Sequence, residues 1–311
     1  MPYAFDDFRN LAGRLIAPVA NDDHLFWYCA ALCADLAYSH VPQFEIGARQ
    51  RAKVVPSEAY QSIIRRRKST DVVAHLRGLT EGEGPPPFAV ATQNVIAIGI
   101  PIDDKLFIAY RGTRLNSVYD WGVNLSASQA PLPGSAEALH RGFFREAMDI
   151  TLELAPIITT YLERSNSWRR VFACGHSLGG AVAAISADIL HRKFNVHFEA
   201  TCIFGTPRYC NHEFIRDRYA LPNRPPIHIR RRGDFVPDIP ARALGYADLP
   251  IEYDPHGPSS LLSSRSLGIK AISGLFFLLP LLATPHFMDR YRKELGAIWR
   301  YEPNGLKLTN L

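Results

Sequence analysis

One serine in the chain lies where a nucleophile could form. The segment "VFACGHSLGGA" (171–181) places Ser177 between glycines, where an apolar run gives way to an alanine-rich run. It fits G-x-S-x-G between a predicted strand and a predicted helix, which is the context of a nucleophile elbow. The glycines leave room in such a tight turn, while strained dihedral angles at the serine expose its hydroxyl. We therefore predict that Ser177 is a nucleophile and not an ordinary turn residue.

An activated serine needs two partners. A histidine must accept the proton of the hydroxyl, and a carboxylate must orient that histidine. On this kind of turn the chain order is serine, acid, histidine, so both partners should follow Ser177. Asp234 in "RRRGDFVPDIP" directly follows a predicted strand and is favoured as the acid. Asp238, flanked by Pro237 and Pro240, stays open as the alternative, since it could serve if the loop doubled back.

Six histidines follow the serine and compete for the role of base. Four come too early or lie at the far end of the following helix: His191, His197, His212 and His228. His286 in "TPHFMDRYRKEL" stands at the start of a predicted helix, where a loop could present it at the sheet edge, so it is favoured. His256 in the proline- and glycine-rich "YDPHGPSS" stays open as the alternative.

Strands and helices alternate around these residues. Helical periodicity predicts helices over 23–39, within 57–78 and from about 141 to 164. The predicted strands are "FAVATQNVIAIGI" and "KLFIAYRG", joined as a hairpin, then "RRVFACGHS", "FEATCIFGTPR" and "PPIHIRRRGDFVP". This alternation, without internal repeats, indicates an α/β fold with a mainly parallel central sheet and helices on both faces. Functional loops then lie at the carboxyl ends of the strands.

Composition excludes several classes of protein. The chain has 311 residues, and its 35 basic and 30 acidic side chains are spread along it, which does not favour nucleic-acid binding. Five cysteines without a CxxC pair favour reduced, buried thiols, and the absence of H-E-x-x-H predicts neither metal nor cofactor. The first residues lack the apolar core of a signal peptide, so we expect a cytoplasmic or peripherally membrane-associated protein. Its oligomeric state is not predicted.

One apolar segment is long enough to raise the question of a membrane. Residues 271–288 contain no Asp, Glu, Lys or Arg, which approaches the ~20 residues that cross a bilayer. Pro280 and Pro285 interrupt the segment, and it ends with the favoured base, so we predict no transmembrane helix. A core helix or loop, and a surface that lines an acyl channel or touches lipid, both stay open.

Seven short sequence motifs occur along the chain in a characteristic order: "CAALCADLAYS", "FIAYRGT" with a following "DW", "HRGF", "GHSLGGA", "FGTPRYCN", "GDFVPDIP" and "HFMDRY". Through these motifs the chain resembles the class 3 lipase family of α/β-hydrolases over about residues 25–295. The resemblance implies a single α/β-hydrolase domain over 1–311. A helical N-terminal segment of about 1–80 would pack on this domain, and a lid region would lie at about 114–139.

The resemblance also implies a set of functional residues. Ser177, Asp234 and His286 match the catalytic triad of the family. Leu178, directly after the nucleophile, should supply one backbone N–H of the oxyanion hole, and Thr113 in "RGT" matches the second donor. Asn124 stands where the family usually has an acid, three residues after the tryptophan of "DW", which weakens the expected support of Thr113. His140 in "HRGF" is predicted to be structural.

The predicted function is that of a serine ester hydrolase. It would cleave acylglycerols or similar long-chain esters through an acyl-enzyme, acting on a lipid or ester substrate at a lipid–water interface. Esterase, phospholipase and acyltransferase activities stay open, because sequence spacing does not show the shape of the acyl pocket. A lipid-binding protein that has the hydrolase fold without turnover is the alternative from another class.

Overall fold

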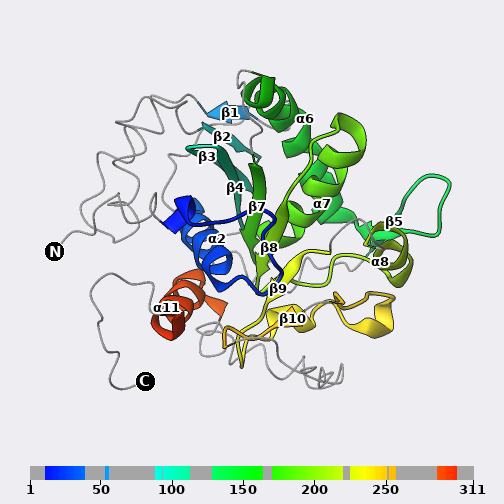
Figure 1. Ribbon diagram of the computed structural model, residues 1–311. Helices are drawn as coiled ribbons and strands as arrows, with labels where there is room; N and C mark the ends of the chain where they lie inside the picture. Colours follow the sequence, from blue (N-terminus) through cyan, green and yellow to red (C-terminus); the bar gives the residue numbers. More distant parts are fainter. Residues whose placement is uncertain are drawn as a thin grey trace.

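The computed structural model describes residues 11–38, 53–55, 88–92, 94–112, 128–163, 170–219, 225–250, 252–256 and 286–299. Eight strands in this part of the chain form one sheet (Figure 1). Their order across the sheet is β1 (Lys53–Val55), β2 (Phe88–Ala91), β3 (Ile96–Ile102), β4 (Lys105–Arg111), β7 (Arg170–His176), β8 (Ala200–Phe204), β9 (Ile227–Ile229) and β10 (Glu252–Tyr253). Strands β1 to β4 are antiparallel, and β4 to β10 are parallel, which confirms the mainly parallel central sheet.

Helices cover both faces of this sheet, as the alternation of elements predicted. Helices α2 (His24–Ala37) and α11 (Met288–Trp299) lie side by side on one face, and α6 (Arg141–Glu163) and α7 (Leu178–Phe194) cover the other (Figure 1). Strand β4 is apolar between Lys105 and Arg111 because both of its faces are buried. Leu106 and Ile108 belong to the core under α6 and α7, whereas Phe107 packs in the core under α2.

Helices α2 and α11, from opposite ends of the chain, contact each other through a buried ion pair. Helix α2 begins at the predicted position, because the Asp23 side chain accepts a hydrogen bond of 3.0 Å from the Phe26 N–H and caps the first turn. Arg292 on α11 donates to Asp35 on α2 at 2.7 Å, and both side chains are largely buried. The helix that follows the predicted base, α11, is thus held on α2.

Two predictions about strands need correction. Residues 88–100 form two strands, β2 and β3, and not one. The Thr92 N–H donates to the Val95 carbonyl at 2.8 Å, and the buried Glu146 on α6 accepts hydrogen bonds from the Thr92 hydroxyl and the Asn94 amide, each at 2.6 Å. These polar side chains stabilise a turn inside an otherwise apolar run. Residues 114–139, whose Ser-, Gly- and Pro-rich sequence favours a loop, contain β5 (Gln129–Pro131), which pairs with β6 (Ala138–His140). Strands of three residues leave no periodic pattern.

Several predictions fall outside the described residues: the helix within 57–78, the first part of the lid region (114–127) and the apolar segment up to residue 285. Thr113 and Asn124 lie there too. In the part of the chain that is described, no helix has the length and apolarity needed to cross a membrane. All five cysteines are buried and unbridged.

Candidate active site

Ser177 stands at the tip of the turn between β7 and α7. Its backbone has φ 59° and ψ −131°, a conformation that costs a residue with a side chain about 1–3 kcal/mol. Hydrogen bonds hold it there. The Ser177 N–H donates to the Phe204 carbonyl of the neighbouring β8, and the Ser177 carbonyl accepts from the Gly180 N–H, each at 3.0 Å. The strain of a nucleophile elbow is therefore present and is balanced by contacts on both sides.

The three glycines around the serine are required by close approach. A methyl group on Gly175 would overlap the backbone of Gly179, and one on Gly179 would overlap the Tyr110 carbonyl of β4. A methyl group on Gly180 would overlap the hydroxyl of Thr206. The turn is thus packed against the ends of both neighbouring strands, as the sequence argument required.

Leu178 is the first residue of α7, which ends 16 residues later at Phe194. The first N–H groups of a helix have no intrahelical acceptor, and the helix dipole favours negative charge beside them. This position suits the predicted oxyanion donor. Thr113, the second predicted donor, is outside the described residues, but Gly112 directly before it is described. A side chain on Gly112 would come within 2.8 Å of the His176 carbonyl, so the chain reaches position 112 right beside the elbow.

The structure brings Asp234 and His286 together in a buried pair. Nδ1 of His286 lies 2.8 Å from Oδ2 of Asp234, which also accepts from the Tyr291 hydroxyl at 2.6 Å. The Val236 N–H donates to Oδ1 at 3.0 Å. Burial works to raise the pKa of Asp234, but the charge interaction with His286 and these three hydrogen bonds outweigh it and lower that pKa. The carboxylate is therefore ionised and favours the His286 tautomer with the proton on Nδ1.

The other ring nitrogen of His286 is available for proton transfer. Nε2 is buried and has no hydrogen-bond partner among the described residues. With the proton on Nδ1, Nε2 carries a lone pair that can accept the proton of a hydroxyl group. The ring of His176, the residue directly before Ser177, has its centroid 4.5 Å from that of His286. The predicted base thus lies beside the elbow.

The carboxyl end of β8 joins the two halves of the site. Phe204 at its end accepts from the Ser177 N–H, and Gly205 after it donates to the Ile229 carbonyl of β9 at 3.0 Å. Gly205 has φ +51°, and a side chain there would come within 2.5 Å of Oδ2 of Asp234. A glycine in a left-handed conformation is therefore needed for the Asp234–His286 pair to reach the same sheet edge as Ser177.

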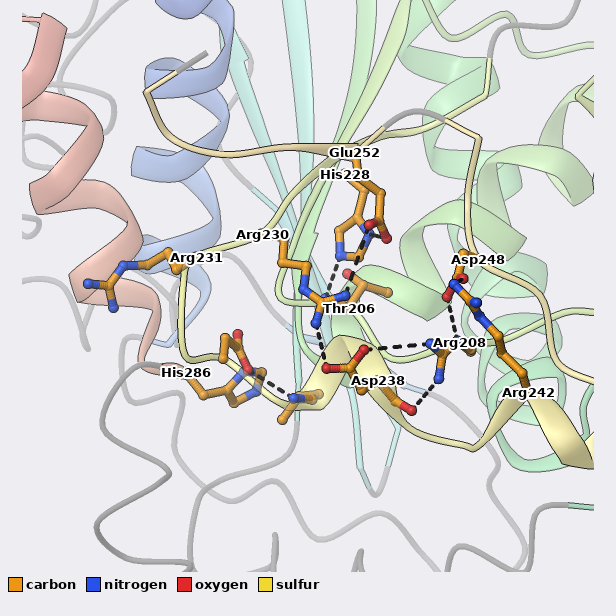
Figure 2. A network of polar contacts seen from close by, with 12 residues as sticks. Thr206, Arg208, His228, Arg230, Arg231, Asp238, Arg242, Asp248, Glu252 and His286 are labelled. Atoms are coloured by element: carbon orange, nitrogen blue, oxygen red, sulfur yellow. Dashed lines mark hydrogen bonds and ion pairs between the residues drawn. The ribbon is translucent and has the colours of Figure 1, made fainter. Parts of the chain in front are cut away.

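The two open alternatives lie elsewhere. Asp238 is bound by Arg230 at 2.5 Å and lies 3.6 Å from Arg208, within a network of buried ion pairs (Figure 2). The hydrogen bond to His286 from this loop comes from Asp234. The His256 side chain is 65% exposed and lies 3.5 Å from Glu294. The structure thus pairs Asp234 with His286 and leaves Asp238 and His256 outside this pair.

Sequence reasoning missed Tyr291, a buried residue of α11. Its hydroxyl accepts from the Arg231 N–H at 3.2 Å and donates to Asp234. Burial, together with the nearby Asp234 carboxylate, raises the pKa of Tyr291 well above its usual value, so the hydroxyl stays protonated and acts as a donor. The motif "HFMDRY" contained this tyrosine, but nothing in the spacing alone pointed to the carboxylate.

His140, predicted to be structural, is buried at the end of β6, directly before α6. Its ring stacks on Phe143 with centroids 3.9 Å apart, and its Nδ1 accepts from the Phe143 N–H at 3.4 Å. Burial lowers the pKa of His140 to about 4, so the ring is neutral at neutral pH. These contacts fit a structural role.

A pocket of about 240 Å³ lies at the opposite edge of the sheet, where β8 and β9 begin. His191 and His197, which the chain order set aside, line it with their ring centroids 4.7 Å apart. Neither Ser177 nor the Asp234–His286 pair takes part in this pocket. Among the described residues, no group of three or more His, Cys, Asp or Glu side chains is arranged to hold a metal ion.

Comparison with known proteins adds to this geometry. Residues 107–244 match the family model described as Lipase (class 3). A lipase of Rhizomucor miehei is 27% identical over 159 residues, which cover 49% of this chain and 42% of that protein. Phospholipase A1-II 5 of Oryza sativa subsp. indica is 34% identical over 86 residues, covering 25% of this chain and 18% of the rice protein. The chain thus spans less than half the length of these relatives.

A solved structure supports the fold. The Lip2 lipase from Yarrowia lipolytica aligns with a TM-score of 0.53 at 19% identity, covering 73% of this chain and 78% of that chain. At this identity the likeness concerns the fold alone. The predicted resemblance to class 3 lipases and the predicted α/β-hydrolase fold are both confirmed.

Proposed function

We propose that this chain, which carries a class 3 lipase region over residues 107–244, is a serine ester hydrolase that cleaves acylglycerols or similar long-chain carboxylic esters. The observation that carries the proposal is the buried Asp234–His286 pair, 2.8 Å apart, beside the strained turn of Ser177. A serine held in this conformation points its hydroxyl out of the turn, and a histidine whose Nε2 has no hydrogen-bond partner among the described residues is the base that its attack requires.

The first half of the reaction would form an acyl-enzyme. Nε2 of His286 accepts the proton of Ser177 while Oγ attacks the ester carbonyl carbon. The carbonyl oxygen becomes an oxyanion, which the backbone N–H groups of Leu178 and Thr113 stabilise. The intermediate then collapses, the bond to the alcohol oxygen breaks, and His286 gives its proton to the leaving alcohol.

The second half would free the acid. Water replaces the alcohol, His286 accepts one of its protons, and the hydroxide attacks the acyl carbonyl. The bond to Ser177 then breaks and the proton returns to Oγ. In both halves Asp234 stabilises the imidazolium without taking its proton, and loss of that carboxylate in a triad costs about 10⁴ in turnover.

The substrate class follows from the relatives' names and stays a proposal. One relative is called a lipase and the other a phospholipase A1, which supports an ester of a fatty acid as substrate. A short-chain esterase or an acyltransferase would use the same residues, differing in the acyl pocket and in the acceptor. Action at a lipid–water interface and the cytoplasmic or peripheral location also stay predictions.

Covalent labelling tests the reaction directly. A fluorophosphonate probe should label the wild-type protein and should leave Ser177→Ala unlabelled, whereas a lipid-binding protein without turnover takes up no probe. Emulsions of triolein, monoacylglycerol and phosphatidylcholine then identify the preferred ester. His286→Ala should abolish hydrolysis, and His256→Ala is the matched control that should remain active. If His256→Ala is inactive while His286→Ala remains active, the assignment of His286 as the base is overturned.

A further inference from the structure

His176 is a buried histidine that the proposed reaction does not use. It is the last residue of β7, directly before Ser177, and only 3% of it is exposed. Its ring lies against that of His286 at 4.5 Å and also against Tyr291 at 5.8 Å. An imidazole in this place contacts the predicted base on one side and adjoins the nucleophile on the other.

Both ring nitrogens of His176 are engaged, and the partners fix their roles. Nε2 lies 2.6 Å from the backbone carbonyl oxygen of His286. A carbonyl can only accept, so Nε2 must carry the hydrogen. In the neutral ring Nδ1 is then an acceptor, and it lies 2.6 Å from the Tyr38 hydroxyl, which therefore donates. One tautomer satisfies both bonds.

The charge states agree with this assignment. Burial, and next the nearby His286, lower the pKa of His176 well below its usual value, so the ring is neutral. Burial raises the pKa of the Tyr38 hydroxyl, which stays protonated. A neutral His176 also matters for the reaction, because a second positive charge beside His286 would oppose formation of the imidazolium.

Tyr38 connects this bond to the strand end that leads to the oxyanion hole. It caps the C-terminus of α2, and its hydroxyl forms a hydrogen bond with the backbone of Gly112. A side chain on Gly112 would come within 3.1 Å of that hydroxyl. The residue after Gly112 is Thr113, the predicted second donor. A single phenol thus contacts the end of β4 and the histidine that holds the base.

We propose that Tyr38 and His176 are positioning residues of the hydrolase: His176 fixes the backbone of His286 through its carbonyl, and Tyr38 fixes His176 together with the end of β4. This inference rests on the proposed function. Asp234 orients the His286 ring, but it does not determine where the backbone of the base stands. The bond from His176 supplies that second constraint. A misplacement of 1 Å in a reacting group costs about 10²-fold in rate, so such a constraint is worth a measurable factor.

Three variants and one control test the proposal. His176→Leu removes the donor to the His286 carbonyl, and we expect kcat for a nitrophenyl ester to fall about 10²-fold with KM nearly unchanged. His176→Gln keeps an amide N–H that can reach the carbonyl, and it should retain clearly more activity than the leucine variant. Tyr38→Phe should lower kcat about tenfold. Tyr209→Phe is the matched control, since it removes a hydrogen-bonded hydroxyl from a buried tyrosine elsewhere in the fold, 2.7 Å from Tyr219.

The outcomes separate the two proposals. If the wild-type protein hydrolyses the ester and both Tyr38→Phe and His176→Leu have the same kcat as the wild type, the positioning role alone is overturned. A change confined to KM, a glutamine variant no better than leucine, or an equal loss in Tyr209→Phe would overturn it as well. A wild-type protein that neither turns over ester nor takes up the fluorophosphonate probe would overturn the proposed function, and this inference with it. If His176→Leu fails to fold by circular dichroism, Tyr38→Phe, which keeps the ring, decides the question.

Discussion

The Nδ1 atom of His286 lies 2.8 Å from Asp234, while Asp238, four residues further along the same loop, is bound by Arg230 and carries no bond to that imidazole (Figure 2). Two aspartates of one loop therefore have different tasks. Asp234 orients the proposed base, and Asp238 neutralises guanidinium groups that are themselves buried. The difference can be measured, because one task concerns the rate and the other concerns the fold.

The two aspartates should differ when each is replaced by asparagine. Asp234→Asn should lower kcat about 10⁴-fold, since the amide no longer favours the required tautomer. Asp238→Asn should leave the folded protein active but lower the free energy of unfolding by about 1.5–3 kcal/mol, because Arg230 loses a hydrogen bond to a charged group while Glu252 remains 4.0 Å away. Ester hydrolysis and urea denaturation of both variants check this. A catalytic loss in folded Asp238→Asn would contradict it.

The strained backbone at Ser177 predicts that two inactive variants will differ in stability. Both Ser177→Gly and Ser177→Ala should be inactive. Glycine tolerates a φ of 59° and alanine does not, so the glycine variant should be more stable than the alanine variant by about 1 kcal/mol. Chemical denaturation compares the two. An alanine variant of equal or higher stability would show that the turn stores no strain.

Gly180 and Thr206 should be coupled energetically. Gly180→Ala should cost about 1–3 kcal/mol, because the new methyl group overlaps the Thr206 hydroxyl, and Thr206→Ala should recover much of that loss. Gly179→Ala is the control: its methyl group would overlap the backbone of β4, so Thr206→Ala should bring no recovery. A double-mutant cycle in urea measures both pairs, and additive effects at Gly180 would exclude the contact.

Removal of the Tyr291 hydroxyl should weaken the proposed base without abolishing it. Tyr291→Phe takes one of three hydrogen bonds from the Asp234 carboxylate, and a bond to a charged group is worth about 1.5–3 kcal/mol. We expect kcat to fall about tenfold, far less than in Asp234→Asn. Steady-state hydrolysis of a nitrophenyl ester distinguishes the two, and an unchanged rate would leave the tyrosine with a packing role alone.

His140 predicts a loss of stability at mildly acidic pH. Its pKa of about 4 in the folded protein lies below the ordinary value of 6.5, so between these values the unfolded chain binds more protons. The free energy of unfolding should fall as the pH drops from 6.5 to 4. His140→Phe keeps the stack on Phe143 and should reduce this fall by on the order of 2 kcal/mol. Part of the fall should remain in this variant, because the pKa of His176 is lowered as well.

That prediction is checked by denaturation midpoints at several pH values. The phenylalanine variant should show a flatter profile than the wild type between pH 4 and 6.5, and the difference in stability between the two should become constant above pH 7. A difference that is constant over the whole range would contradict the depressed pKa of His140.

The sequence was sufficient where a pattern repeats or where geometry allows few residue types. The glycines around Ser177 are required by steric overlap, so the elbow could be predicted from the spacing alone. Asp234 and His286 were favoured by chain order, and their hydrogen bond agrees with that choice. Long helices such as α6 were found because their apolar positions recur over many turns.

What the sequence did not reveal depends on contacts between distant segments. The turn at Thr92 depends on Glu146, which is 54 residues away in the chain. Tyr38 lies 138 residues from His176, and no local pattern links them. Tyr291 lies within a motif, but its role depends on how α11 packs against the loop of Asp234. Strands as short as β5 and β6 form because partners are placed beside them, not because of their own periodicity.

The pairing of α2 with α11 has a consequence for how the protein is made. Synthesis delivers the N-terminal helix and the elbow first, whereas the segment carrying His286 follows His176 by 110 residues. At about 5–20 residues per second, a ribosome needs on the order of 5–20 s to cover that interval. Through this time the elbow serine has no base. The proposed hydrolysis can therefore begin only after α11 has docked on α2.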